Sequence, residues 1–571
     1  MPEALPDTIG PFMAWTWEQI APHFEALQRV DLNAANVQDW LAGWTRLSDL
    51  LSERYARLNT AVTVDTTDAA AEQAYNTFID QVRPQAQAAE QQLKQKLLAG
   101  GLEPAGFEAP LRKMRAEAAL FRAENLPLLA QENKLSSEYN KIIGAQTVEW
   151  DGDELTIQQL RRYLHHPERR VRERAWRLAA ERQLSDRPAI NELWRRFTGL
   201  RRTLAANAGF SGYRDFRWQQ MLRLDYTPQD AQRFDQAVEQ VVVPAATRLY
   251  RRYAQRLGAP SVRPWDLDND LIPLSHPPLP PYGALEDLPR KAEAAFRRVD
   301  AQFGEQFGQM RVEGLLDLDN HKGKAPGAYC TSYPVTGRPF VFMNAIGLSS
   351  DVRTILHESG HAFHNYARLR LPFAQQRTPG LEFAEVASMA MELLASPYLD
   401  VEPEAFYAPE AARRFRIAHL EQALTFWPYM AVVDSFQHWV YTHPEQAGEA
   451  AYCDAKWLEL WWRYLPGVDW TGLEEAAMTG WQRKQHIHRY PFYYIEYGLA
   501  QLGAVQVWAN ARRDPQAALA QYRHALELGG TVTLPELYAA AGARLAFDAG
   551  TLAEAVTLAE QVINELEMQA V

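Results

Sequence analysis

Helical periodicity dominates this chain and limits what it can fold into. Apolar residues recur every three or four positions in four long segments: 12–59, 69–98, 108–146 and 349 to the end. Convincing strand signals occur only between about 311 and 345, in the β-prone runs 328–332 and 340–343. The pattern predicts a mainly α protein with a small β element in the middle of the chain.

A proline-rich stretch interrupts the helical pattern at residues 259–283. Prolines at this density cannot continue a helix, and they favour an extended backbone. We therefore expect a long surface connection in this part of the chain.

Composition narrows the class of protein further. The 571 residues carry 59 Lys and Arg against 71 Asp and Glu, which gives a net charge of −12, and 47% of them are hydrophobic. Such a chain can bury large cores and is not a disordered one. Because nucleic-acid binding depends on basic residues that neutralise phosphates, the acidic balance argues against a nucleic-acid partner.

No targeting or membrane segment is expected. The first residues lack the basic start and apolar run of a signal peptide, and no later stretch has about 18 consecutive apolar residues. Cys330 and Cys453 are the two cysteines, too few for a disulfide framework or a thiolate zinc cluster. We interpret Cys330 as a small buried side chain and not as a nucleophile. These features predict a cytoplasmic protein with no membrane partner.

A metal-binding pattern, His357-Glu358-Ser359-Gly360-His361, follows the β region. Two histidines four residues apart lie on one face of a helix, so both imidazoles can reach a single metal ion. Glu358 lies beside them, where it can take a proton from a water at that metal. Residues 349–351 suit a helix start and precede the pattern. The spacing predicts a metal site on a helix.

A catalytic zinc site usually has three protein ligands and one open position, so a third ligand is needed. The metzincin arrangement requires glycine at position 364 and histidine at 367, but the sequence has His364 and Ala367, which excludes that class. We interpret His364 as a packed histidine or one that supports a ligand, because a fourth ligand would close the water position.

The next apolar helix, 381–392, carries three carboxylates: Glu382, Glu385 and Glu392. A buried carboxylate needs a metal or a cation as its partner. Helical spacing places all three on similar sides and does not choose between them. An ion pair with Arg353 or Arg368 is the alternative for each.

The segment 486–498 combines His486 and His488 with Tyr490, Tyr493, Tyr494 and Tyr497. Aromatic clusters are often simply core or interface. Beside a metal site, however, their hydroxyl and imidazole groups can stabilise the oxyanion that forms when water attacks a peptide carbonyl.

Together these residues resemble the thimet oligopeptidase and oligoendopeptidase F family of zinc metallopeptidases. Residues 383–388 are similar to the family's Phe-x-Glu-x-x-Ser segment, which implies Glu385 as the third ligand. Glu392 then falls where the family keeps another acidic residue, which implies that it orients a ligand histidine. Residues 322–330 and 204–210 resemble further family segments, the first of them from the oligoendopeptidase F branch. The resemblance covers roughly residues 110–565.

The resemblance also implies roles for the aromatic segment, because the family keeps a histidine and several tyrosines there for the oxyanion. Two alignments of the segment are possible, and we expect His488 and Tyr497 to be catalytic. The remaining substrate-binding candidates are Tyr490, Tyr493, Tyr494, His486 and Gly327. Gly327 opens the edge strand 327–344, which can pair with a peptide backbone.

The fold implied by the family is a large, elongated, mainly α body with a deep substrate channel and a small β-sheet near the zinc-binding helix. We expect residues 1–200 to form one wall of the channel and residues 201–571 to form the catalytic domain. One Zn²⁺ ion and short unfolded peptides are the expected cofactor and substrates.

The predicted function is that of a zinc endopeptidase in which Glu358 serves as general base. A carboxypeptidase or dipeptidase of related helical fold is the first alternative, and a non-catalytic peptide-binding protein is the second. The sequence leaves open the cleavage preference, peptide length, oligomeric state and the choice of zinc over another divalent metal.

Overall fold

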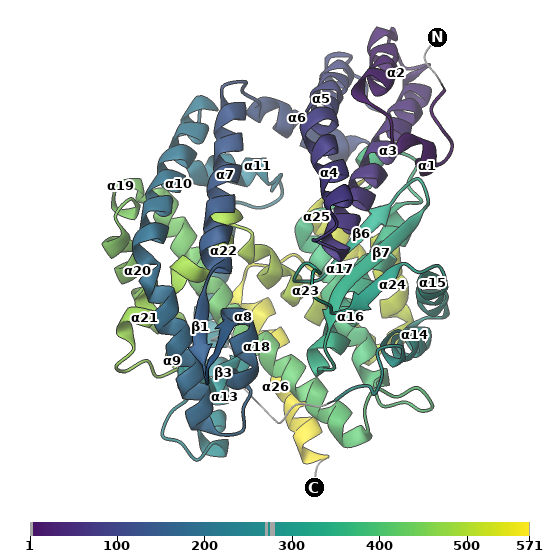
Figure 1. The fold of residues 1–571 in the computed structure, drawn as a ribbon. Coiled ribbons are helices and arrows are strands. Elements are labelled where there is room, and N and C mark those ends of the chain that lie inside the picture. Colours follow the sequence, from purple (N-terminus) through teal and green to yellow (C-terminus); the bar gives the residue numbers. More distant parts are fainter. Residues whose placement is uncertain (1–3, 269–271, 274–279, 570–571) are drawn as a thin grey trace. The chain divides into compact units, whose positions relative to one another are not determined.

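The computed structural model describes residues 4–268, 272–273 and 280–569, which form two compact units. The first unit combines Met1–Ala119, Leu279–Ala412 and Gly503–Leu545, and the second combines Leu120–Pro278, Arg413–Leu502 and Ala546–Val571. Helices dominate both units (Figure 1), as the periodicity predicted. Both units contain residues from before and after position 200, so their division does not follow the boundary expected from the sequence.

The first unit begins with a layer of N-terminal helices. Its helices are α1 (Ile9–Phe12), α2 (Trp17–Arg29), α3 (Val37–Val64), α4 (Ala69–Thr77), α5 (Arg83–Ala99), α6 (Glu108–Leu120), α14 (Asp287–Val299), α15 (Ala301–Val312), α16 (Ser349–Arg368), α17 (Leu381–Ala395), α24 (Pro515–Leu528) and α25 (Leu534–Ala540). The short π-helix η1 (Phe78–Val82) and the short 3₁₀ helices η4 (Ala374–Gln376) and η5 (Ser396–Tyr398) join some of them. Buried side chains at helical spacing, such as Trp40, Trp44 and Leu47, form the core between α2, α3 and α5.

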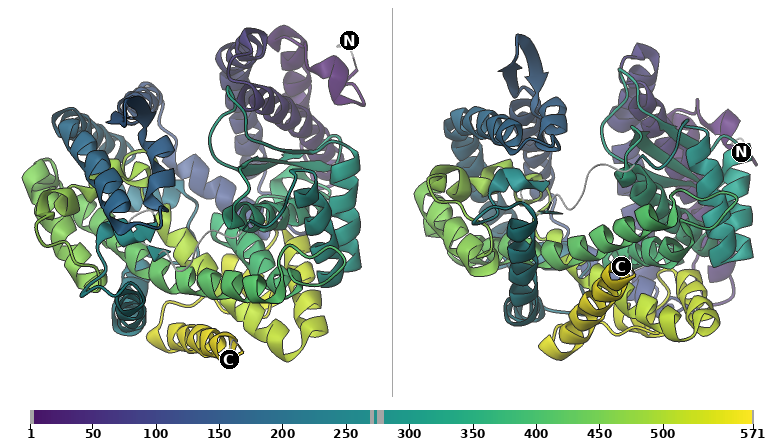
Figure 2. Two further views of the ribbon diagram at one scale, coloured as in Figure 1. Left: turned by 60° about the horizontal axis from the view of Figure 1, so that its bottom comes forward. Right: turned by 90° about the horizontal axis from the view of Figure 1, so that it is seen from below.

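A three-stranded sheet lies beside these N-terminal helices (Figure 2). Its strands are β5 (Leu316–Asp319), β6 (Tyr329–Tyr333) and β7 (Arg338–Ala345), in the order β5-β7-β6. The pairing of β5 with β7 is parallel, and that of β6 with β7 is antiparallel, with Tyr329 opposite Phe342. The two predicted strands are confirmed. Within the described residues β6 pairs with β7 alone, so it is an edge strand.

Helix α16 starts directly after β7 and packs against that strand and against α17. The Asp351 carboxylate caps its start, because one oxygen accepts hydrogen bonds from the backbone N–H groups of Ile346, Gly347 and Leu348 at 2.7–3.0 Å. The predicted start is correct, but the residue at the N-cap position is Leu348 and not a serine.

Glycine allows α16 and α17 to approach each other closely. A Cβ atom at Gly360 would lie 2.6 Å from the Cα of Ser388 and 2.8 Å from the carbonyl oxygen of Ala387. Tyr522 of α24 supports α17 from another side, since its hydroxyl donates to the same carbonyl at 2.6 Å. The helix pair that carries the metal motif is therefore tightly packed.

The second unit is also helical. Its helices are α7 (Asn125–Gly144), α8 (Ile157–Leu164), α9 (Arg169–Ser185), α10 (Arg187–Asn207), α11 (Tyr213–Gln220), α12 (Pro228–Ala237), α13 (Val243–Arg256), α19 (Pro444–Ala447), α20 (Ala450–Tyr464), α21 (Glu474–Met478), α22 (Gln485–Arg489) and α26 (Ala549–Met568). The short π-helix η2 (Val238–Val242) and the short 3₁₀ helices η3 (Pro264–Asp266) and η6 (Gly480–Arg483) belong to the same unit. Two long helices, α18 (Pro409–Thr442) and α23 (Tyr494–Arg513), contribute residues to both units.

Strands also occur outside the predicted region. Strands β1 (Thr147–Trp150) and β2 (Asp153–Thr156) form an antiparallel hairpin, and β3 (Leu267–Asp268) pairs with β4 (Ile272–Pro273). The expectation of strands only between 311 and 345 is therefore wrong. The predicted surface connection 259–283 contains η3, β3 and β4, while its residues 269–271 and 274–279 lie outside the described part.

Across the described part of the chain, the hydropathy of every helix is too low, or its length too short, for a membrane span.

Candidate metal centre and aromatic cluster

Three side chains from α16 and α17 form a compact group of metal-binding atoms. His357 and His361 lie one turn apart on α16, with ring centroids 4.9 Å apart, and Glu385 faces them from α17. The potential ligand atoms of the three residues all lie within 4.8 Å of one another. Among the described residues this is the one such group of His, Cys, Asp and Glu side chains.

The spacing of this group fits a tetrahedral metal. The Nε2 atoms of His357 and His361 lie 3.4 and 3.8 Å from Glu385 Oε2. Ligands held about 2.0–2.1 Å from a tetrahedral zinc ion are separated by about 3.3–3.4 Å. Two imidazoles and one carboxylate are also a donor set that zinc accepts, with a fourth position left for water. The residues present therefore fit the metal that the sequence predicted.

Two further side chains contact the metal-binding group. Glu392, two turns after Glu385 on α17, has one carboxylate oxygen 2.7 Å from Nδ1 of His357. That contact keeps the proton on Nδ1 and directs Nε2 towards the metal-binding group. Ser388 donates a hydrogen bond of 3.3 Å to Glu385. The structure thus brings the expected Glu392 into contact with a ligand.

The electrostatics of the group reflect its burial. For His357, burial opposes protonation, but the hydrogen bonds to Glu385 and Glu392 outweigh it and raise the pKa well above its ordinary value. For His361, burial dominates and lowers the pKa to about 4. Burial also acts to raise the pKa of Glu385, but the bond from His357 outweighs it, so the carboxylate stays ionised. The neutral imidazole of His361 and the ionised carboxylate of Glu385 are thus in the forms that bind metal, whereas His357 must lose a proton to bind one.

Glu358 lies beside the ligands and has no assigned partner. Its side chain is buried, and its Oε2 has no hydrogen-bond partner among the described residues. Burial raises the pKa of Glu358 to about 7, and the charges of Glu385 and Glu392 act in the same direction. An unpartnered carboxylate with a pKa near neutrality suits a group that accepts and returns a proton.

His364 and Cys330, which the sequence analysis also considered, lie in the first unit but do not belong to the metal-binding group. His364 is buried against the ring of Phe383, at a centroid distance of 6.0 Å, and does not belong to the metal-binding group. The Cys330 thiol accepts a hydrogen bond from Asn365 at 3.4 Å, and burial raises its pKa, which keeps the sulfur in its unreactive thiol form.

Gly327 precedes the edge strand β6. Its φ of +101° is a backbone conformation that favours glycine, and a Cβ at this position would meet open space. Asn344 holds this turn, because its amide donates to the carbonyl oxygens of Ala325 and Gly327, both at 2.9 Å. Sequence reasoning missed this role of Asn344, since the contact depends on the pairing of β6 with β7.

The aromatic cluster of residues 486–497 lies in the second unit. The ring of His486 has its centroid 4.9 Å from that of Tyr494, 6.0 Å from Tyr493, 6.2 Å from Tyr490 and 6.3 Å from Tyr497. Burial and the charges of Lys484 and Arg489 lower the pKa of His486 to about 3, so the imidazole is neutral. The structure therefore groups all four expected tyrosines around His486.

His488 has a different environment from the one predicted. Its side chain is completely buried, and its ring stacks between Tyr139 at 4.4 Å and Trp481 at 5.8 Å. The ring centroid of Trp194 lies 5.4 Å from that of His488, in an edge-to-face arrangement. Residues two positions apart on a helix do not share a face, so His488 points into this aromatic core when His486 points to the tyrosines. A completely enclosed imidazole does not suit the catalytic role expected for His488.

Buried polar side chains hold the loop between α22 and α23. Arg201 donates a hydrogen bond to the carbonyl oxygen of His488, and Arg223 donates to that of Phe492 and to Glu496. Gln437 accepts the backbone N–H of Phe492 at 2.7 Å, and Phe492 has a φ of +64°. Sequence reasoning missed these residues, because Arg201 and Gln437 come from distant helices, Arg223 comes from the loop between α11 and α12, and no local motif marks them.

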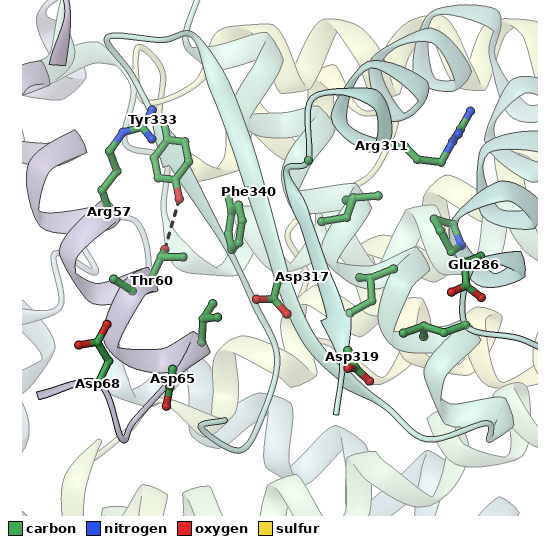
Figure 3. A pocket seen from close by; sticks show the side chains of 17 residues that line it. Arg57, Thr60, Asp65, Asp68, Glu286, Arg311, Asp317, Asp319, Tyr333 and Phe340 are labelled. Carbon is green, nitrogen blue, oxygen red and sulfur yellow. Dashed lines mark hydrogen bonds between the residues drawn. The ribbon is translucent and has the colours of Figure 1, made fainter. Parts of the chain in front are cut away.

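A separate cavity of about 820 Å³ lies between α3, the start of α14 and the sheet (Figure 3). Tyr333 and Phe340 project into it from the sheet, and its other walls include Arg57, Asp317 and Asp319. None of the metal-binding residues lines it. This cavity is therefore not the candidate reaction centre.

Comparisons with known proteins agree with this site. The family model described as Peptidase family M3 matches residues 162–557, which include the metal-binding group and the aromatic cluster. A PZ peptidase A structure with an inhibitor shares 27% identity at a TM-score of 0.86, covering 99% of this chain and 98% of that one. A protein assigned as oligoendopeptidase F from Bacillus anthracis str. Ames shares 25% identity at a TM-score of 0.83, covering 97% of both chains.

A curated relative, Oligopeptidase PepF of Bacillus subtilis (strain 168), is 24% identical over 240 residues. The match covers 40% of this chain and 34% of the relative, so this chain matches about a third of the length of that protein.

Proposed function

Because the chain belongs to peptidase family M3, we propose that it is a zinc-dependent oligopeptidase that cleaves internal bonds of short unfolded peptides. One observation carries the proposal: His357, His361 and Glu385 present ligand atoms within 4.8 Å of one another, next to the unpartnered carboxylate of Glu358. The likeness to oligoendopeptidase F and PZ peptidase A over nearly the whole chain favours an oligopeptidase over the other helical alternatives.

The chemistry follows from the residues at the site. His357, His361 and Glu385 would hold one Zn²⁺ ion, which would polarise the scissile carbonyl and lower the pKa of the attacking water. Glu358 accepts the proton of that water and later donates it to the leaving amine. Glu392 keeps His357 in the tautomer that binds metal through Nε2.

We assign the oxyanion donors to the aromatic cluster. A neutral His486 and the tyrosine hydroxyls around it are hydrogen-bond donors of the kind that stabilise a tetrahedral oxyanion. This proposal replaces His488 by His486 and keeps Tyr490, Tyr493, Tyr494 and Tyr497 as candidate donors. The edge of β6 after Gly327 is the proposed docking strand for the peptide backbone.

Peptide hydrolysis by the zinc-loaded protein and by Glu358→Gln tests the function. The variant should keep its zinc and lose at least about 100-fold in kcat, because it keeps the ligands and loses the base. Mass spectra of the products should show internal cuts, whereas stepwise loss of terminal residues would favour a carboxypeptidase. Equal activity of the variant, or a wild type that neither binds zinc nor cleaves peptides, would overturn the proposal.

A second comparison tests the oxyanion assignment. His486→Phe should lose about 100-fold in kcat, and His488→Phe should change thermal stability more than kcat. The opposite result would return the role to His488.

Composition supports a proposal for the location and partners of the protein. Both cysteines are free thiols, which agrees with a cytoplasmic location. The proposed partners are short peptides.

A further inference from the structure

We propose that Lys484 is a positioning residue of the aromatic cluster, which fixes the hydroxyl of Tyr494 as a hydrogen-bond donor to the substrate. The inference rests on the proposed function, because it assumes that the cluster stabilises the oxyanion. Lys484 immediately precedes α22, and Tyr494 is the first residue of α23, so their contact joins the two helices on either side of the loop.

The contact between the two side chains is close and directional. Lys484 Nζ lies 2.6 Å from the hydroxyl oxygen of Tyr494. An ammonium group has three donors and no acceptor, so the lysine donates and the tyrosine oxygen accepts. The hydroxyl hydrogen of Tyr494 must then be directed to another acceptor.

Aromatic rings hold the ammonium group in place. Nζ lies 4.2 Å from the ring centroid of Tyr494 and 4.8 Å from that of Tyr429. Cation–π contacts of this length restrict a side chain that would otherwise be mobile. Tyr429 and Tyr494 are both largely buried, which lowers the local dielectric constant and strengthens the charged hydrogen bond.

The rest of the cluster lies beside the ring of Tyr494. His486 lies 4.9 Å and Tyr497 5.8 Å from its ring centroid. A charged donor on the tyrosine oxygen also polarises its O–H bond, which makes it a stronger donor. Burial raises the pKa of Tyr494 well above its ordinary value, so the hydroxyl keeps its proton.

A double-mutant cycle on the full-length, zinc-loaded protein tests this role. We expect Lys484→Met to lower kcat about tenfold and to leave KM within about twofold, because the donor is needed in the transition state only. In the Tyr494→Phe background the same change should have no further effect on kcat. Lys484→Arg should restore most of the activity, since a guanidinium also donates to the hydroxyl.

Two controls separate positioning from folding and from net charge. Lys456→Met removes a lysine that forms an ion pair with the exposed Glu459, and it should leave kcat and KM unchanged. Melting temperature and zinc content of every variant should equal those of the wild type. If Lys484→Met does not fold, Lys484→Gln is subject to the same criteria.

Several outcomes would overturn the inference. One is a kcat of Lys484→Met equal to that of the wild type. Another is an equal loss of kcat from Lys484→Met in the wild-type and Tyr494→Phe backgrounds. The third is a change of KM in Lys484→Met with no change of kcat. A wild type that cleaves no peptide would contradict the proposed function itself. Wild-type turnover together with unchanged Lys484→Met kinetics would contradict the role of Lys484 alone.

Discussion

Three carboxylates of α17 have similar places in the sequence and different roles at the site. Glu385 faces the two histidines, whereas one carboxylate oxygen of Glu392 lies 2.7 Å from Nδ1 of His357. Glu382 is buried at the start of the helix and does not belong to the metal-binding group. Glu385 and Glu392 share a face but lie about 10 Å apart along the helix axis, so their places along α17 decide which carboxylate joins the metal-binding group and which contacts Nδ1 of His357.

Glu392→Gln should weaken zinc binding by about 10–100-fold, because a neutral amide orients and polarises His357 less well than a carboxylate does. Competition with a chromogenic zinc chelator measures the affinity. Glu382→Gln is the matched control, with the same change of charge on the same helix, and its zinc affinity should stay within about twofold of the wild type. Equal affinities for the two variants would contradict the role of Glu392.

The sequence predicts part of this site and leaves part open. His357, Glu358 and His361 follow from helical spacing, because residues four apart share a face. The choice of Glu385 needed the family resemblance, and its ligand geometry needed the approach of α17. His488 could not be distinguished from His486, since this requires the direction in which each ring leaves α22. The stacking of His488 between Tyr139 and Trp481 supplies that direction.

At the scale of elements, the site depends on how closely α16 and α17 pack. Gly360 lies within the metal-binding motif and faces Ser388 and Ala387 of α17. Its lack of a Cβ therefore sets the distance between the helix that supplies two ligands and the helix that supplies the third.

Gly360→Ala should destabilise the protein by about 1–3 kcal/mol, because the new Cβ would overlap the backbone of α17. This cost should exceed the gain of up to about 1 kcal/mol that alanine brings to a helix. Gly199→Ala is the control, since a Cβ at that helical position meets nothing within 4 Å, and it should stabilise the protein slightly. Urea unfolding measures both changes, and a stabilised Gly360→Ala would show that the helices can separate without cost.

A buried carboxylate between α12 and α18 links stability to pH. Asp235 accepts a hydrogen bond of 2.6 Å from Ser435. Burial, together with the charge of Asp434, raises the pKa of Asp235 well above 3.8. Between the unfolded and folded pKa values the unfolded chain has lost the proton that the folded protein keeps, so stability falls as pH rises through this window.

Asp235→Asn should therefore raise the apparent melting temperature at pH 7, by about 2 °C or more, and have a smaller effect near pH 4. The amide keeps an oxygen that can accept the bond from Ser435. Thermal melts of wild type and variant across this pH range measure the difference. Asp39→Asn, at an exposed carboxylate, should show no such dependence on pH. A gain that is greatest at pH 4 would contradict the protonated state of Asp235.

Sequence patterns predicted long elements better than short ones. Strands β6 and β7 were predicted because two short β-prone runs occur there, separated by Pro334 and Gly337. The hairpin of β1 and β2 was missed, because each strand has four residues and lies between helices. Its turn has a recognisable signal, Asp151-Gly152, whose φ values of 54° and 94° suit a tight hairpin turn.

At the scale of the whole molecule, metal binding should contribute to stability. A ligand that binds only the folded protein stabilises it by about 4 kcal/mol at a thousand times its dissociation constant. Removal of zinc by a chelator should therefore lower the apparent melting temperature by about 5 °C or more. Scanning calorimetry measures the shift, and Glu385→Gln should show a much smaller one. An equal shift in both proteins would mean that the chelator acts elsewhere.

The mainly α architecture was predictable from periodicity, but the division into units was not. Local patterns report which faces of helices are apolar, and they do not report which distant segments share a core. Residues 1–119, 279–412 and 503–545 share one unit although long segments separate them in the sequence. The expected role of residues 1–200 as a channel wall stays a prediction.

Each unit of this protein is assembled from three separate stretches of chain. No continuous piece of the gene therefore encodes either unit. Exchange of one unit with that of a relative would need three coordinated replacements, and a single crossover would combine parts of both units from different parents. Variation in this protein should consequently accumulate by substitutions and loop changes within the chain, and not by the exchange of whole units.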